Sequence, residues 1–312
     1  MINLKILGCL LIPILLCSCA PNQEETAIKG HLFVLVSESV APVLGHEVGR
    51  FMSLYQARGA DVAYAVVRSR DANVRFVNDS IRCIITTIPL TANEKDRVKK
   101  TTDHFVEIVL AYDGVIAVVQ NRNSCKDLSL KQIREILSGR ITKWEQLGNS
   151  GSLRGTIRLI LEDSSDVLTY LSQRLLDGGE SKANFRQTHS SEETLEEISK
   201  EPRALGFVAL NTSDTLNTKL RIVPLAADSI LADTTFRPPA ESIGTAYTPH
   251  PAHIYLNYYP MKRAVYVYSK TTPGDFATGF TAFLASPEGQ KIFLENGLVP
   301  GTQKIILKRP GQ

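Results

Sequence analysis

The sequence predicts an α/β fold, and three observations favour this class. Short apolar runs alternate with stretches whose apolar residues recur every three or four positions, as in strands that alternate with helices. The chain has 312 residues, which is enough for two domains of ordinary size. It is 43% hydrophobic and 21% charged, a composition typical of a globular protein with a sizeable core.

The first part of the chain contains three predicted strands and one helix. The helix places Leu44, Val48 and Phe51 on one face. The predicted elements are strands at 31–37, 61–67 and 80–87, a helix that follows the first strand and ends at Gly59, and a longer extended run at 105–121 that is interrupted at Asp113 and Gly114.

A second α/β unit begins after Asn121. Asp127 or Ser129 is placed to cap a helix that Gly139 closes. The elements that follow are a strand at 156–161, a helix that begins near Asp166, a helix at 192–199 capped by Ser190, a strand at 204–210, a long loop at 234–251, a strand at 264–270, and helices at 273–286 and 287–297. The last three elements belong to neither unit. We therefore expect the tail of the chain to return to the first unit.

The first residues are typical of an export signal. Lys5 precedes an apolar run at 6–16 that is too short to span a bilayer stably. The run ends in Leu16-Cys17-Ser18-Cys19, which resembles a bacterial lipobox and predicts cleavage before Cys19. Residues 1–18 are then a signal peptide and 19–29 a lipidated tether. One alternative is cleavage before Cys17, which is less suitable because the bulky Leu16 stands where a small residue is required. The other is an ordinary signal peptide that is cut elsewhere.

Lipidation predicts the location of the protein. Two or three acyl chains on one residue give stable attachment, whereas a single chain gives marginal binding. Residues 20–29 are polar and without periodicity, which suits a flexible tether. We therefore expect an extracytoplasmic protein, periplasmic or on the cell surface, that a lipid anchors to a bacterial membrane.

Charge and cysteine content narrow the range of partners. The net charge of +3 becomes +2 (3 − 1) once the segment with Lys5 is removed, which is too small to favour nucleic acid. Cys83 and Cys125 then remain as the unmodified cysteines. A disulfide between them is one alternative in an oxidising space. Two buried or lone thiols are favoured, because Cys83 lies in an apolar run of strand type.

No sequence motif indicates an enzyme. The chain has no Gly-x-Ser-x-Gly, no P-loop and no Gly-x-Gly-x-x-Gly. His250 and His253 are the one histidine pair with a spacing near that of metal ligands, but they lie in a Pro-rich loop, where a surface pair is more common than a zinc site. The sequence therefore predicts no catalytic residue, no metal and no cofactor.

Hydroxyl-bearing loops are the remaining feature that bears on function. They follow apolar runs at Ser39, Ser69, Thr87, and Ser164 with Ser165. Hydroxyls and the unpaired amides of a helix N-terminus suit a tetrahedral oxyanion. Serine and threonine also cap helices and turns generally, so an anion site and ordinary caps both fit this spacing.

Several segments follow one another in a characteristic order. They are VSESVAPVL (36–44), CIITTIPLTANEKD (83–96), AYDGVIAVVQNRN (111–123), DLSLKQIREILSGRITKWEQLG (127–148), ALGFVAL (204–210), YYPMKRAVYVYSK (258–270) and SPEGQKIFLENGLVP (286–300). In this order they resemble the motifs of type II periplasmic solute-binding proteins, most closely the phosphate-binding-protein-like lipoproteins of ABC importers. The resemblance covers nearly all of the mature chain and is most specific at 111–148.

The resemblance implies a two-lobed periplasmic binding protein type II fold, with mixed sheets flanked by helices and a ligand cleft between the lobes. Lobe one is expected to comprise residues 30–115 and 255–312, and lobe two residues 116–254. The implied function is capture of phosphate or a similar small oxyanion by a monomer, which delivers it to the permease of an ABC importer. The alternative is a divergent member that binds no phosphate and acts as a structural, signalling or receptor-associated lipoprotein.

The resemblance also implies which residues contact the anion. They are Ser39, the amide of Val40, Ser69, Thr87, Ser164 and Ser165. The family's arginine is expected near residues 160–162, where this chain has no basic residue. Arg68 and Arg70 are candidates for charge compensation, with ordinary surface arginines as the alternative.

Acidic residues stand close to the same loops. Glu38, Asp163 and Asp166 add negative charge around the predicted cleft. A like charge at 4 Å opposes a phosphate by about 4 kcal/mol near a protein surface. The loop at 162–166 is therefore where phosphate binding is least compatible with the sequence.

Overall fold

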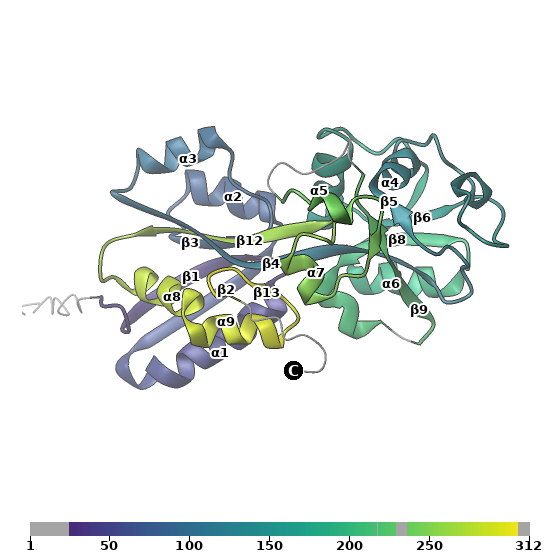
Figure 1. Cartoon of the computed structure of the whole chain (residues 1–312). Coiled ribbons are helices and arrows are strands. Elements are labelled where there is room, and N and C mark those ends of the chain that lie inside the picture. The colour runs from purple at the N-terminus through teal and green to yellow at the C-terminus, as the bar shows by residue number, and fades with distance from the viewer. Residues whose placement is uncertain (1–24, 217, 229–235, 305–312) are drawn as a thin grey trace, which may run out of the picture.

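Two α/β halves lie side by side in the computed structural model (Figure 1), which describes residues 25–216, 218–228 and 236–304. We call the half with the N-terminal strands lobe one and the other half lobe two. The long strand β4 (His104–Gln120) runs through both halves, and β12 (Lys262–Thr271) pairs with its first part. The predicted signal peptide and Cys19 lie outside the described residues.

The sheet of lobe one has the strand order β2-β1-β3-β12-β4. Strand β1 (Gly30–Ser37) pairs in parallel with β2 (Ala60–Val67) and β3 (Cys83–Thr86), whereas β12 is antiparallel to β3 and β4. Its helices are α1 (Ala41–Tyr55), α2 (Ser69–Asn78), α3 (Ala92–Lys99), α8 (Phe276–Ala285) and α9 (Pro287–Glu295), with the 3₁₀ turn η1 (Gln56–Arg58) and the short β13 (Val299–Pro300). Because β1, β2 and β3 are parallel, the loops that follow them meet at one edge of the sheet.

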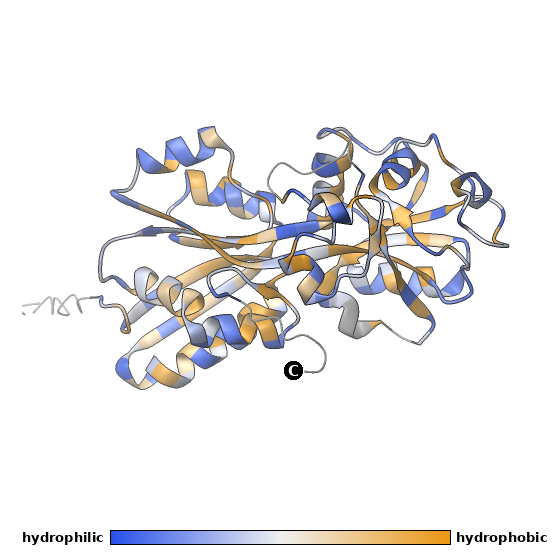
Figure 2. Ribbon diagram, viewed as in Figure 1, coloured by the Kyte–Doolittle hydropathy of each residue, from blue (hydrophilic) through white to orange (hydrophobic). Residues whose placement is uncertain are grey.

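Both faces of this sheet are covered. Successive residues of a strand point to opposite faces, so Val34 and Val36 pack with Phe51 on one side, while Leu35 packs with Phe76 on the other. Burial on both faces explains the continuous apolar run of β1. Figure 2 shows hydrophobic strands between helices of mixed polarity in this half.

Lobe two has the strand order β4-β8-β6-β7, and β9 (Leu220–Val223) also pairs with β4. Strands β6 (Arg158–Glu162), β7 (Phe185–Thr188) and β8 (Ala204–Ala209) are mutually parallel where they pair. The other elements are α4 (Leu130–Leu137), η2 (Trp144–Leu147), α5 (Asp166–Leu175), α6 (Ser191–Lys200), η3 (Leu210–Thr215), η5 (Ala240–Ser242) and α7 (Pro251–Tyr255), and a small sheet of β11 (Ala246–Tyr247), β10 (Leu225–Ala226) and β5 (Leu128–Ser129).

Local sequence signals account for much of lobe two. Ser129 accepts a hydrogen bond from the Gln132 amide and Ser190 accepts one from the Glu193 amide, so both predicted caps are confirmed. Trp144 is fully buried, and its Nε1 donates to the Arg203 carbonyl at 2.9 Å. A buried indole with a paired N–H anchors the η2 turn to the core of this lobe.

The α/β class is confirmed, but β7, β9 and α7 were not predicted, and η5 and β11 lie within the predicted long loop at 234–251. The predicted interruption at Asp113 and Gly114 is wrong, because β12 pairs across both residues and β4 continues through them. Helix α2 was not predicted, because its sequence SRDANVRFVN is polar and its apolar residues are few.

Cys83 and Cys125 are free and buried, which confirms the alternative of two thiols. Among the described residues no helix is long and apolar enough to cross a membrane.

Candidate anion site

A buried carboxylate is held where three loops of lobe one converge. It belongs to Asp166, the first residue of α5 in lobe two, whose side chain is 2% exposed. The Ser69 amide donates to Oδ1 at 2.9 Å, and the Ser69 hydroxyl donates to Oδ2 at 2.6 Å. The Thr87 hydroxyl donates to Oδ2 at 3.2 Å, and the Ser37 hydroxyl donates to the same oxygen. These donors together form an oxyanion-binding set.

The parallel strands bring these donors together. Ser37 ends β1, Ser69 begins α2 directly after β2, and Thr87 follows β3. The Ser69 amide is one of the amides that a helix leaves unpaired at its N-terminus, where the helix dipole also favours negative charge. The Ser69 hydroxyl additionally accepts from the Thr87 amide at 3.0 Å, which ties the two loops to each other.

Of the residues of lobe one that were predicted to contact an anion, some donate hydrogen bonds to the Asp166 carboxylate and others only lie near it. Ser69 and Thr87 contact the carboxylate directly. The Ser39 hydroxyl lies 3.0 Å from the Ser37 hydroxyl, so it is linked to the carboxylate through Ser37. The Val40 amide donates to the Ser37 carbonyl at 2.9 Å, so it is directed at its own loop and not at the carboxylate.

The two predicted serines of lobe two do not join this set. The Ser165 hydroxyl accepts from the Leu168 amide at 3.1 Å and donates to the Glu162 carbonyl at 3.1 Å, so it caps α5. Ser164 is exposed, has a φ of +53°, and lines a cavity of about 550 Å³ within lobe two together with Asp163. The side chain that reaches lobe one from this loop is the next one, Asp166.

Arg70 lies away from the carboxylate and Arg68 acts on neighbouring acids. Arg70 Nη1 pairs with Glu94 Oε1 of α3 at 2.7 Å. Burial raises the pKa of Glu38 and of Glu162. Arg68 is exposed, and its positive charge opposes this effect by lowering both pKa values. Neither arginine is hydrogen-bonded to Asp166 in the structure.

A buried arginine from β12 supplies positive charge that the sequence did not reveal. Arg263 is 2% exposed, and its Nε and Nη2 donate to Asp113 Oδ2 at 3.0 and 2.6 Å. Its Nη1 lies 3.5 Å from the Thr87 hydroxyl. The register of β12 on β4 places Arg263 directly opposite Asp113. The sequence does show one charged residue in each of two apolar strands. Only the register of the two strands shows that these residues pair.

Comparison with known proteins settles the family. A model described as the PBP superfamily domain matches residues 21–288 of the chain. The chain belongs to this superfamily. The match confirms the resemblance to periplasmic binding proteins that the order of motifs predicted.

Relatives of this PBP-superfamily chain are known in several bacteria. It is 27% identical over 298 residues to the phosphate-binding protein PstS of Bacillus subtilis (strain 168), covering 93% of this chain and 87% of the relative. Its fold is similar to an ABC-type phosphate transport receptor from Vibrio cholerae, with a TM-score of 0.66, 20% identity and coverage of 86% and 99%. A putative phosphate ABC transporter substrate-binding protein from Clostridium perfringens, solved with bound phosphate, gives a TM-score of 0.64, 18% identity and coverage of 87% and 99%. These structures show that the two-lobed fold is shared.

A second carboxylate faces Asp166 in this PBP-superfamily chain. Glu38 of lobe one accepts the Asp166 backbone N–H at 3.2 Å through Oε1. Burial raises the pKa of Glu38 to about 7, although the hydrogen bond from Asp166 lowers it. The Asp166 and Glu162 charges raise it further. The predicted negative charge around the cleft is therefore carried by Glu38 and Asp166 at the contact between the lobes, while Asp163 lies in the cavity of lobe two.

Two cavities flank the Asp166 contact, and both are lined from both lobes. One, of about 370 Å³, is lined by the carboxylates of Glu38, Glu162 and Asp166 among others. The other, of about 250 Å³, includes Arg263 and Lys262, whose pKa burial lowers to about 8. One interlobe cavity of this superfamily member is thus lined by carboxylates and the other by basic side chains.

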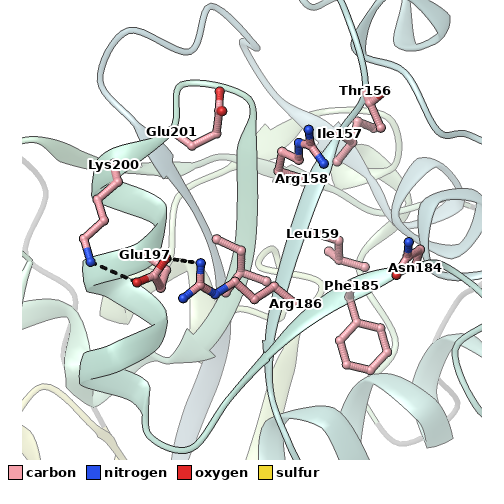
Figure 3. A pocket seen from close by; sticks show the side chains of 11 residues that line it. Thr156, Ile157, Arg158, Leu159, Asn184, Phe185, Arg186, Glu197, Lys200 and Glu201 are labelled. Atoms are coloured by element: carbon pink, nitrogen blue, oxygen red, sulfur yellow. Dashed lines mark hydrogen bonds and ion pairs between the residues drawn. The ribbon is translucent and has the colours of Figure 1, made fainter.

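A further cavity of this PBP-superfamily chain, of about 680 Å³, lies elsewhere. It is formed at the start of β6 and β7, whereas Asp166 follows the end of β6. Figure 3 shows Arg186 and Lys200 both directed at Glu197, with Nη1 and Nζ at 2.7 and 2.9 Å. Arg186 and Lys200 are thus both engaged by Glu197 in this cavity.

Proposed function

We propose that the chain is an extracytoplasmic solute-binding protein that captures phosphate or a similar small oxyanion for an ABC importer. The observation that carries this proposal is the set of donors from Ser37, Ser69 and Thr87 around one oxyanion. Hydroxyls and a helix N-terminal amide suit a phosphate as well as a carboxylate. The names of the relatives, which include phosphate-binding and phosphate-transport proteins, support phosphate as the solute.

Positive charge for a bound anion would come from Arg263. Its Nη1 lies 3.5 Å from the hydroxyl of Thr87, which is one of the donors. A guanidinium that is already positioned by Asp113 loses little freedom when an anion binds. In this proposal Arg263 takes the place of the arginine that residues 160–162 lack, and Arg68 and Arg70 have no direct part.

The two halves are proposed to move as lobes around the solute. Residues 30–115 with 255–312 would form lobe one, and residues 116–254 lobe two. The donors named above all come from lobe one, while α5 approaches them from lobe two. Hinge closure around a ligand at such a junction is a common motion of two-lobed binding proteins. We propose that one monomer carries the complete site.

Phosphate binding is tested by thermal and chemical unfolding. We expect inorganic phosphate to stabilise the mature chain by about 2.7 kcal/mol at a hundredfold excess over Kd, because a ligand that binds the folded state alone stabilises it by mass action. Ser69→Ala, which removes one hydroxyl donor, is the matched variant and is expected to weaken binding by about tenfold, or about 1.4 kcal/mol. Absence of any shift with phosphate, sulfate or arsenate would refute the proposal.

The chain is further proposed to be lipid-anchored through Cys19. We expect Cys19→Ser to move the full-length protein from the membrane fraction to the soluble fraction of a bacterial host, because the acylated residue is lost. Cys17→Ser is the matched control and should leave the protein in the membrane fraction. Retention of the Cys19→Ser variant would contradict this anchor.

The second candidate function is a divergent lipoprotein that binds no phosphate and serves a structural, signalling or receptor-associated role. Asp166 and Glu38 favour it, because their carboxylates occupy positions where an anion would otherwise meet amides and hydroxyls. The phosphate titration separates the two candidates.

A further inference from the structure

The Asp166 carboxylate makes contacts that a bound anion would make. It is 2% exposed and receives the amide and hydroxyl of Ser69 at 2.9 and 2.6 Å, together with the hydroxyls of Thr87 and Ser37. We infer that Asp166 is a built-in anionic ligand, which competes with the solute for the donors of lobe one and holds the lobes together without solute. This inference rests on the proposed function, since it assigns the same donors to the captured anion.

The contact is reciprocal between the lobes. Asp166 of lobe two reaches the N-terminus of α2, while Glu38 of lobe one accepts the first amide of α5 at 3.2 Å. Both helices have ten residues, so each presents a full helix N-terminus to the opposing carboxylate. A pair of helix ends that would bind an external anion is thus occupied by the protein's own acids.

Further hydrogen bonds close the interface around this contact. The Tyr170 hydroxyl of α5 donates to the Lys262 carbonyl of β12 at 3.0 Å. The Asn211 amide of η3 donates to the Ser39 carbonyl. Contacts from α5 and η3 of lobe two therefore reach lobe one in addition to the Asp166 contact, so the protein's own groups join the lobes.

A solute has to displace Asp166 in order to bind. An anion next to the seated carboxylate would meet Asp166, Glu38 and Glu162, all of which line the same side of the contact. Arg263 is a buried cation beside Thr87, and it is already ion-paired with Asp113. Because the donors accommodate one oxyanion at a time, the apparent affinity for phosphate is reduced by the fraction of molecules in which Asp166 is withdrawn.

Calorimetric titration with inorganic phosphate tests the competition. We expect Asp166→Ser to bind phosphate about ten- to a hundredfold more tightly than the wild type, which corresponds to an open state populated at about 1 to 10%. Asp163→Ser is the matched control, because Asp163 carries the same charge three residues away but lines the cavity of lobe two. Equal or weaker phosphate binding by Asp166→Ser, in a protein whose circular dichroism is unchanged, would overturn the inference.

Small-angle scattering without phosphate provides an independent readout. We expect the ligand-free wild type and Asp163→Ser to have the same compact radius of gyration, and Asp166→Ser to be larger because the lobes separate. Asp166→Asn, which keeps the size of the side chain and removes its charge, is the second variant and should shift in the same direction. A wild type as extended as both Asp166 variants would overturn the inference. If the variants open but neither they nor the wild type bind phosphate, Asp166 closure stands and the phosphate assignment fails.

Discussion

Arg263→Met is expected to destabilise the protein by about 3 to 5 kcal/mol, since removal of one partner leaves the other buried charge uncompensated. Asp113 is 1% exposed, and its Oδ2 accepts from two nitrogens of Arg263. Its Oδ1 has no hydrogen-bond partner in the described part of the chain, so the bonds that compensate this carboxylate there are those from Arg263 to Oδ2. Urea unfolding at neutral pH measures the loss.

An exposed ion pair gives the control for this substitution. Arg50 pairs with Glu288, and both side chains are more than two-fifths exposed. Arg50→Met should therefore cost less than about 1 kcal/mol. The double variant Arg263→Met with Asp113→Leu removes both buried charges and is expected to recover part of the stability. A double variant less stable than Arg263→Met alone would show that Asp113 is not the group left unpaired.

Glu47→Met is expected to stabilise the protein by up to about 5 kcal/mol at pH 8, because proton uptake costs about 1.4 kcal/mol for each of the 3.5 pH units (8 − 4.5) above the usual pKa of 4.5. Glu47 lies on the buried face of α1 with 0% exposure. Neither of its carboxylate oxygens has a hydrogen-bond partner among the residues that the structure describes. Burial raises its pKa to about 9, and the charge of Glu288 adds to this effect.

The sign of the pH dependence follows from the two pKa values. In the unfolded chain Glu47 ionises above its usual pKa of 4.5, whereas in the folded protein it keeps its proton up to about pH 9. Folding takes up a proton in this window, so the contribution of Glu47 to stability falls as the pH rises from 4.5 to 9. The advantage of Glu47→Met should therefore shrink towards pH 5. The exposed Glu295→Met is the control, and an advantage of equal size at both pH values would contradict the assignment.

Residues on loops after parallel strands were the predictable part of the site. Ser69 and Thr87 were identified because a hydroxyl after an apolar strand lies at the edge where helix N-termini gather. Ser37 belongs to the same hydroxyl-bearing loop as Ser39, but only Ser39 was predicted to contact the anion, whereas Ser37 is the direct donor in the structure. Ser164 and Ser165 were expected to bind an anion, but the helix begins at Asp166 and Ser165 serves as its cap.

The remaining features depend on contacts that local sequence does not encode. Arg263 meets Asp113 because of the register between β12 and β4, whose residues are separated by 150 positions. The negative charge of Asp166 was apparent from the sequence, but its insertion among donors 79 to 129 positions away depends on how the two lobes approach each other. Local patterns therefore predict the elements and their caps, while the relative position of the lobes decides which side chain fills the anion site.

The crystal structure of Asp166→Ser grown with inorganic phosphate, and without sulfate, tests most directly whether the donors of lobe one form a phosphate site that Asp166 otherwise fills. We predict a phosphate at the position of the lost carboxylate, within hydrogen-bonding distance of the Ser69 amide and the Thr87 hydroxyl. Lobes that remain in contact with no anion at this position, or phosphate bound only elsewhere on the chain, would contradict this assignment.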